Sequence, residues 1–239
     1  MAWNDNNTAT LPRSESRVEV MNAFMRSIYN WMTLGIGLTA IISCTITYTP
    51  VGSVLLQAGG PVLMWGTLIA AFGMAIYMQA RIQKLSASTA AQIFILYSAL
   101  NGVWLSYVLM AYTGASVANA FIATAGMFAG MSLYGLYTKK DLTSWGSFLF
   151  MGLIGIIIAM LVNLFIGSTV MTMVISVIGV IIFCGLTAYD TQLFREMGEN
   201  IPQNDATAVR RGVIIGALTL YLNFLNLFLM LLRLIGNRD

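Results

Sequence analysis

The residues from 145 to 166 read WGSFLFMGLIGIIIAMLVNLFI, a run without a single charged side chain. A helix needs roughly 20 apolar residues to cross a hydrocarbon core of about 30 Å, and this run is long enough to do so. An uninterrupted apolar stretch of this length is typical of a membrane-spanning helix and too long for a buried strand. It places the chain among membrane proteins.

Six further stretches have the same apolar character. They lie at 28–49, 61–80, 89–112, 116–138, 170–190 and 213–235. The composition agrees, because 58% hydrophobic and 9% charged residues in a chain of 239 exclude an ordinary soluble globule. We therefore predict an all-α integral membrane protein, a seven-helix transmembrane bundle. Residues 1–27 are predicted to be a polar, flexible cytosolic tail and residues 28–239 a single transmembrane domain.

The basic residues predict the orientation of the bundle. The segments 50–60, 113–115 and 167–169 carry no charge, and only Arg233 and Arg238 fall on the same side as these segments. The remaining basic residues all fall on the other side: Arg13, Arg17, Arg26, Arg81, Lys84, Lys139, Lys140, Arg195, Arg210 and Arg211. The positive-inside rule then places the N-terminus in the cytosol. An odd number of spans puts the C-terminus outside, unless the last helix is re-entrant.

The residues that are missing exclude several functions. The chain has no histidine, which removes Ser-His and Cys-His nucleophiles, the HExxH zinc motif and an imidazole pH switch. No lysine follows Lys140, so a retinal protein is excluded, and an intramembrane aspartyl protease would need a second aspartate in a span. A scattered net charge of +3 does not indicate nucleic-acid binding. We predict that the protein is not an enzyme and that any pH response uses carboxylates.

Asp190 is the one carboxylate in or at a predicted span. An ionisable group at the centre of a spanning helix costs about 2.5–3.5 kcal/mol on insertion scales, so such a residue indicates a function. The alternative is a solvated helix end. Arg81, at the same predicted depth, could pair with Asp190, or its side chain could extend to the lipid headgroups instead.

Two patterns of small or polar residues recur inside the spans. Asn223 and Asn226 are three apart and share one helical face, where they need partners inside the bundle. The alternative for both is ordinary interhelical hydrogen bonding. Small residues at GxxxG or similar spacing let helix backbones approach closely, so we predict close packing within the chain, or less strongly a face for a second copy. The glycines in question are Gly126, Gly130, Gly152 and Gly155.

Four runs together resemble the Bax inhibitor-1 family, especially its bacterial inner-membrane branch. They are Tyr97 to Gly102, Tyr137 to Leu142, Gly185 to Gln192, and Gly216 through Phe224 to Arg233. The resemblance extends from about residue 20 to the C-terminus. It implies a multi-pass protein of the bacterial inner membrane in which six helices surround the seventh. Members of the family are described as pH-sensitive calcium leak channels or as regulators of cell death and membrane stress.

The resemblance also implies a site. In the family, an aspartate that ends the sixth helix and another in the seventh form the pH sensor, and an arginine of the second helix pairs with it in the closed state. Asp190 matches the first aspartate and Arg81 the arginine, but Asn223 stands where the second aspartate is expected. Three nearby polar residues are expected to support this site: Tyr189, Tyr221 and Asn226.

The substitution of an amide for a carboxylate changes the expected chemistry. Two neighbouring carboxylates take up protons as a coupled unit, which an aspartate beside Asn223 cannot do. Calcium prefers six to eight oxygen ligands, so Asp190 alone is expected to bind calcium weakly. The leading hypothesis is a leak for calcium or another cation, gated by Asp190 and Arg81. The alternative is a regulator or scaffold that transports nothing and binds another membrane protein. No cofactor other than calcium is expected, and the bilayer is the one certain partner; the oligomeric state is left open.

Overall fold

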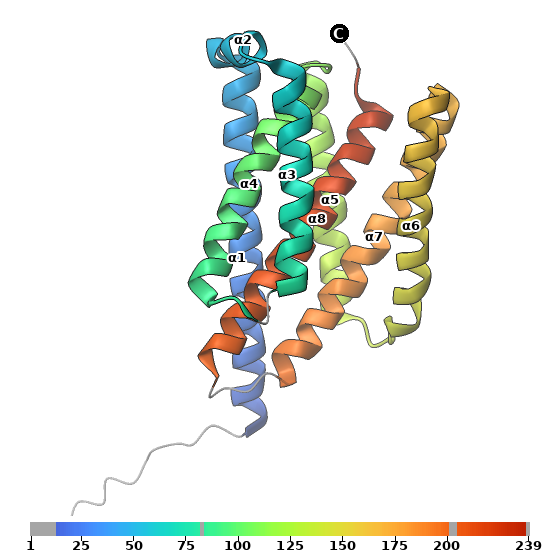
Figure 1. Ribbon diagram of the computed structural model, residues 1–239. Helices are drawn as coiled ribbons and strands as arrows, with labels where there is room; N and C mark the ends of the chain where they lie inside the picture. The colour runs from blue at the N-terminus through green and yellow to red at the C-terminus, as the bar shows by residue number, and fades with distance from the viewer. Residues whose placement is uncertain (1–12, 82–83, 201–204, 238–239) are drawn as a thin grey trace, which may run out of the picture.

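The computed structural model describes residues 13–81, 84–200 and 205–237, and these residues are helical apart from short connections (Figure 1). The helices are α1 (Arg13–Tyr48), α2 (Pro50–Gln57), α3 (Gly60–Arg81), α4 (Ala87–Leu109), α5 (Gly114–Tyr137), α6 (Thr143–Ile166), α7 (Thr169–Asn200) and α8 (Ala206–Ile235). Within the described residues, seven helices, all except the short α2, are long and apolar enough to cross a membrane. The prediction of an all-α membrane bundle is confirmed.

Three helices extend beyond their predicted apolar limits on the side of the N-terminus. α1 begins at Arg13, α7 continues to Asn200 and α8 begins at Ala206. These extensions pack on one another, since the buried ring of Phe24 in α1 lies against Gly198 of α7 and Gly212 of α8. The predicted boundary at residue 27 is therefore wrong for residues 13–27, which are helical because packing continues past the apolar run. Residues 1–12 of the predicted tail lie outside the described residues.

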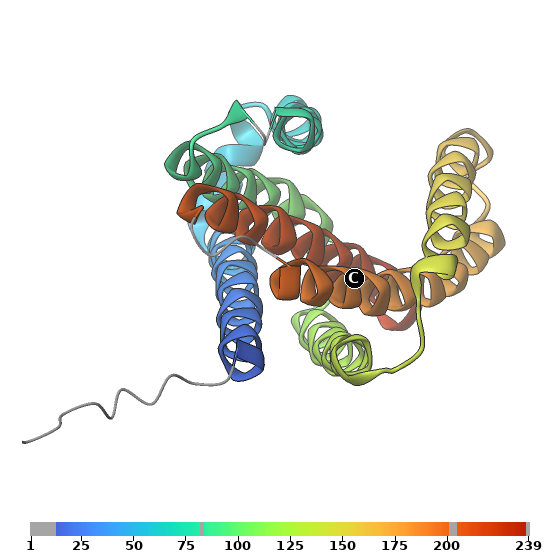
Figure 2. The same ribbon diagram turned by 90° about the horizontal axis from the view of Figure 1, so that it is seen from below.

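The last helix, α8, forms the centre of the bundle. In its most apolar stretch 72% of the residues are buried, against 11% in α3 and in α6. α8 packs against α7, α1, α5 and α4, while α3 packs on α4 and α6 packs on α7. Seen along the bundle, α3 and α6 lie at the periphery on opposite sides (Figure 2). The seventh span is thus central, as expected, and is one continuous helix, but four helices make its main contacts.

Of the four glycines at which close helix packing was predicted, one lies against a neighbouring helix and three do not. A Cβ added to Gly152 of α6 would lie 2.5 Å from Cδ1 of Ile182 in α7, so these two helices approach closely there. In the described structure a Cβ on Gly126, Gly130 or Gly155 would meet no atom within 4 Å. The prediction of close packing within the chain is wrong for these three glycines, because GxxxG spacing defines a helical face and not the direction in which it points.

Candidate functional site

Asp190 and Asn223 meet between α7 and α8. The Asn223 Nδ2 donates a hydrogen bond to Asp190 Oδ2 at 2.6 Å. Asn223 is buried and Asp190 is half-buried. The amide of Asn223 thus satisfies one oxygen of the Asp190 side chain. The structure therefore brings together the two residues that the resemblance predicts to share a site.

Arg81 lies apart from this pair. It ends α3, its side chain is exposed, and the main neighbours of α3 are α4 and α2. Across the described ranges the one ion pair joins Arg195 to Glu199, at 3.5 Å and one turn apart in α7. An ion pair between Arg81 and Asp190 is thus not formed in this structure, and the polar partner of Asp190 is Asn223.

One narrow stripe of the central helix is less covered than the rest. Between Gly212 and Leu232 every residue of α8 is buried except four half-buried ones: Ile215, Thr219, Leu222 and Asn226. Spacings of four, three and four residues put these side chains on a single face of the helix. Asn223 lies at the edge of this partly exposed stripe. The Asp190–Asn223 contact therefore borders the one side of α8 that its neighbours leave partly uncovered.

The three residues expected to support the site have other contacts. The Asn226 Nδ2 donates to the Leu222 carbonyl of its own helix at 2.8 Å. The ring of Tyr189 packs on α6, where a Cβ at Gly146 would lie 2.6 Å from Tyr189 Cζ. Tyr221 is fully buried on a different side of α8. Tyr189 packs between two helices and Asn226 bonds within its own helix, and none of the three makes a described hydrogen bond to the Asp190 carboxylate.

Tyr221 instead ties α8 to α1 and α4. Thr39 Oγ1 donates to the Ser98 carbonyl at 2.8 Å, and the Tyr221 hydroxyl lies 2.8 Å from the same Thr39 oxygen. A threonine hydroxyl has one hydrogen, so the tyrosine is the donor of the second bond. These two hydrogen bonds join three helices in the core. The sequence does not single out Thr39, because one threonine in an apolar run has no distinguishing pattern.

Calcium ligation at Asp190 has little support from neighbouring carboxylates. The described residues contain no group of three or more His, Cys, Asp or Glu side chains that could hold a metal ion. Asp190 and Asn223 offer a few oxygen atoms between them, whereas calcium takes six to eight. Any cation at this site would keep most of its water or backbone ligands, which is compatible with passage and not with tight retention.

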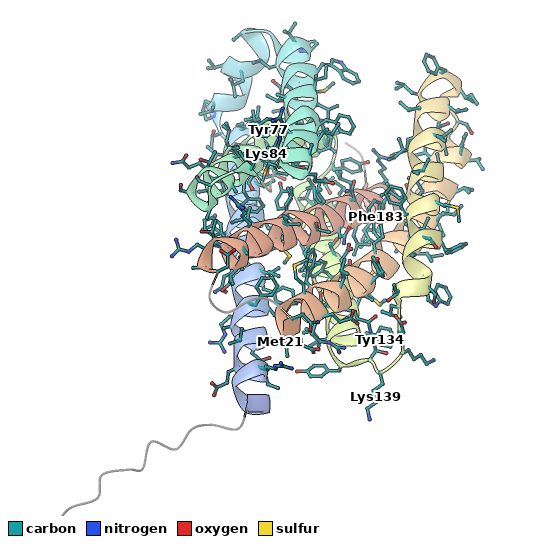
Figure 3. All side chains as sticks on the ribbon, turned by 60° about the horizontal axis from the view of Figure 1, so that its bottom comes forward. Met21, Tyr77, Lys84, Tyr134, Lys139 and Phe183 are labelled. Atoms are coloured by element: carbon teal, nitrogen blue, oxygen red, sulfur yellow. The ribbon has the colours of Figure 1, made fainter. Side chains whose placement is uncertain are left out.

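The turn of α7 after Asp190 holds the connection between α5 and α6. The backbone amide of Leu142 donates to Gln192 Oε1 at 2.8 Å, and Gln192 Nε2 donates to the Lys140 carbonyl at 2.9 Å. Arg195 Nη1 donates to the Leu136 carbonyl at 2.7 Å. Lys139 points away from the ribbon at this end of the bundle (Figure 3). This role of Gln192 could not be predicted from the sequence, because its partners are backbone groups about fifty residues earlier.

Replacing Gln192 with alanine is expected to loosen this connection. Two hydrogen bonds from a buried side chain to backbone groups are lost, at about 0.5–1.5 kcal/mol each, so local opening should rise roughly ten-fold. Trypsin cleavage after Lys139 and Lys140, followed over time in detergent, measures this opening. Gln92→Ala, on an exposed position of α4, is the matched control and should leave the rate unchanged. Equal cleavage of both variants would contradict the clamping role.

The chain is similar in sequence to known proteins. The family profile described as "Inhibitor of apoptosis-promoting Bax1" matches residues 21–239. The inner membrane protein YbhL of Escherichia coli K12 is 47% identical over 230 residues, which cover 95% of this chain and 98% of YbhL. Protein RP147 of Rickettsia prowazekii and a protein of Borreliella burgdorferi are each 40% identical, over 96% and 95% of this chain and 95% and 97% of their own lengths. The chain therefore belongs to the Bax inhibitor-1 family.

Proposed function

We propose that the protein is a proton-sensitive leak pathway for calcium or another cation, with the Asp190–Asn223 pair as its gate. The observation that carries the proposal is the 2.6 Å hydrogen bond between these residues at the edge of the partly exposed stripe of α8. A carboxylate inside a membrane bundle is costly and is found where it faces an ion pathway or a specific partner. Here its polar partner is neutral, so the charge of Asp190 is available to attract a cation.

The surroundings of Asp190 favour a response to protons. α7 packs against α5 and α6, which carry no charged side chain, and against α1 and α8. The charged residues described on α1 and α8 lie in the first half of α1, in the second turn of α8 and in its last turn: Arg17, Glu19, Arg26, Arg210, Arg211 and Arg233. Beyond Asp190, α7 itself carries Arg195, Glu196 and Glu199. Protonation of Asp190 therefore changes the charge of the middle of this interface from negative to neutral. The amide of Asn223 can then accept from the carboxyl group by rotating, so the two helices keep a hydrogen bond while the attraction for cations is lost.

The proposed topology follows the distribution of basic residues. The start of α1, the end of α3 and the connection between α5 and α6, which all carry basic residues, lie toward one end of the bundle in Figure 1, and the positive-inside rule assigns this end to the cytosol. The C-terminus, at the opposite end in Figure 1, is then periplasmic. By analogy with YbhL, described as an inner membrane protein, we place this protein in the bacterial inner membrane. A closed state in which Arg81 pairs with Asp190 would require α3 to move toward α7.

Replacing Asn223 with aspartate is expected to restore a second titration and to strengthen calcium binding. Two carboxylates separated by a hydrogen-bond distance share a proton and titrate as a pair, and a second carboxylate should raise apparent calcium affinity by on the order of ten-fold. Calcium flux into proteoliposomes across a series of pH values, for the native protein and Asn223→Asp, tests both parts. Asn226→Asp adds a carboxylate one turn away and serves as the control. Identical flux curves for the native protein and Asn223→Asp would refute the proposal.

A second candidate is regulation by binding another membrane protein, without transport. The observation in its favour is Asn223 itself, because a family site that has lost a carboxylate can persist for its contacts alone. A partner that copurifies stably with the native protein, together with liposomes that show no calcium flux at any pH, would support this function. Flux that depends on Asp190 would exclude it as the sole function.

A further inference from the structure

A second polar region lies at the other end of the bundle, far along α8 from Asn223. A cavity of about 710 Å³ opens between the last turns of α6, the first turns of α7 and the end of α8. Figure 1 shows these three helix ends together at the end that carries the C-terminus. The proposed gate contributes no residue to this cavity, which therefore belongs to a different site.

The lining of the cavity has a polar part and an apolar part. Arg233 of α8 and Asn163 and Thr172 of the α6–α7 hairpin supply the polar part, and Met160 and Ile175 belong to the apolar part. The Arg233 guanidinium extends across the cavity toward α6, since its Nη1 lies 3.7 Å from the Met160 sulfur. A cationic group thus lies beside apolar wall, at the level where these helices end.

The wall formed by α6 and α7 is built by hydrogen bonds within the hairpin. Asn163 Nδ2 donates to Thr172 Oγ1 at 2.7 Å, and the Ser168 backbone amide donates to Asn163 Oδ1 at 3.0 Å. Gly167 ends α6 in the left-handed region, with φ of 68°, which turns the chain directly into α7. The hairpin therefore presents a fixed surface to Arg233.

The outer surface of this hairpin is strongly apolar. Leu164, which also lines the cavity, is 68% exposed, and Phe165 and Val170 are 88% and 74% exposed. Side chains of this kind at the end of spanning helices contact lipid, so the wall to which Leu164 belongs adjoins the bilayer. A ligand can reach it from the membrane.

We propose that this cavity binds one anionic phospholipid, with the phosphate at Arg233 and an acyl chain along Met160, Leu164 and Ile175. Arginine matches phosphate through several parallel N–H donors, which gives the head of the ligand. The apolar wall indicates that the ligand also has an acyl tail, because inorganic phosphate would leave that wall uncovered.

The test uses the purified full-length protein, delipidated in a neutral detergent. Phosphatidylglycerol, phosphatidylcholine or inorganic phosphate is added separately, and the midpoint of thermal unfolding and the bound lipid detected by native mass spectrometry are recorded. Phosphatidylglycerol should raise the midpoint and remain bound, because a ligand that binds only the folded state stabilises it. An equal shift with inorganic phosphate would show an anion site without a lipid tail, and an equal shift with phosphatidylcholine would show that the charge is not recognised. Either result overturns the proposal.

Two pairs of variants locate the site. Arg233→Gln should weaken phosphatidylglycerol binding by roughly five- to ten-fold, whereas Arg210→Gln, at the other end of α8, should leave it unchanged. Met173→Trp fills the cavity from α7 and should also reduce binding, while Met151→Trp, on an equally exposed position of α6 outside the lining, should not. The second pair keeps the test decisive if Arg233→Gln does not fold. Unchanged binding in both Arg233→Gln and Met173→Trp would refute the proposed site.

Discussion

Replacing Gly135 with alanine is expected to destabilise the bundle strongly. Gly135 is buried in α5, and a Cβ there would collide with the backbone carbonyl oxygen of Ala188 in α7 and lie 3.0 Å from Thr191 Cβ. A backbone atom cannot rotate away, so α5 and α7 must separate. Overpacking of this kind costs about 1–3 kcal/mol or more. The midpoint of thermal unfolding in detergent, followed by tryptophan fluorescence, should fall by several degrees.

Gly126→Ala and Gly130→Ala are the matched controls for Gly135→Ala, because they make the same change in the same helix. A Cβ at either position meets no atom within 4 Å. Alanine is favoured over glycine in a helix by roughly 0.5–1 kcal/mol, so both controls should leave the midpoint unchanged or raise it. A fall of equal size in all three variants would show that the α5–α7 contact at Gly135 is not specific.

Replacing Asp190 with asparagine is expected to remove the pH dependence of cation flux. The amide keeps the size of the side chain and can still exchange a hydrogen bond with Asn223, so the bundle should remain folded. It cannot change charge, and so flux in proteoliposomes should be the same from acidic to neutral pH. Asp141 is not a competing source of this response, since hydrogen bonds from the hydroxyl and the amide of Thr143 lower its pKa and keep it ionised.

Asp205→Asn is the control for the Asp190 experiment. Asp205 caps the N-terminus of α8 by accepting from the amides of Thr207 and Ala208, and asparagine caps a helix about equally well. This variant therefore removes a carboxylate of the chain without removing its structural contact, and its flux should follow the native pH curve. If Asp190→Asn also follows the native curve, Asp190 is not the proton-sensitive group.

The candidate site shows which contacts could be predicted from the sequence and which could not. The resemblance to the family predicts that Asp190 and Asn223 share a site, and in the structure a hydrogen bond joins their side chains. The same resemblance assigned Arg81 to the site, yet Arg81 is exposed on a helix that packs on α4. Gln192 lies in the matched run from Gly185 to Gln192, but only the structure shows that it holds the α5–α6 connection. Contacts of this kind depend on which helices are neighbours.

The sequence by itself determined the compartment and the seven spans. Hydropathy is a local property, and the fixed thickness of a bilayer converts it into helix lengths without any knowledge of the fold. The tertiary structure alone decided which helix faces are covered. In the structure Gly152 faces α7 and Gly126 faces no neighbouring helix, and one stripe of α8 beside Asn223 stays partly exposed. Such choices depend on the packing of helices distant in sequence, and apolar side chains that suit lipid suit a helix interface equally well.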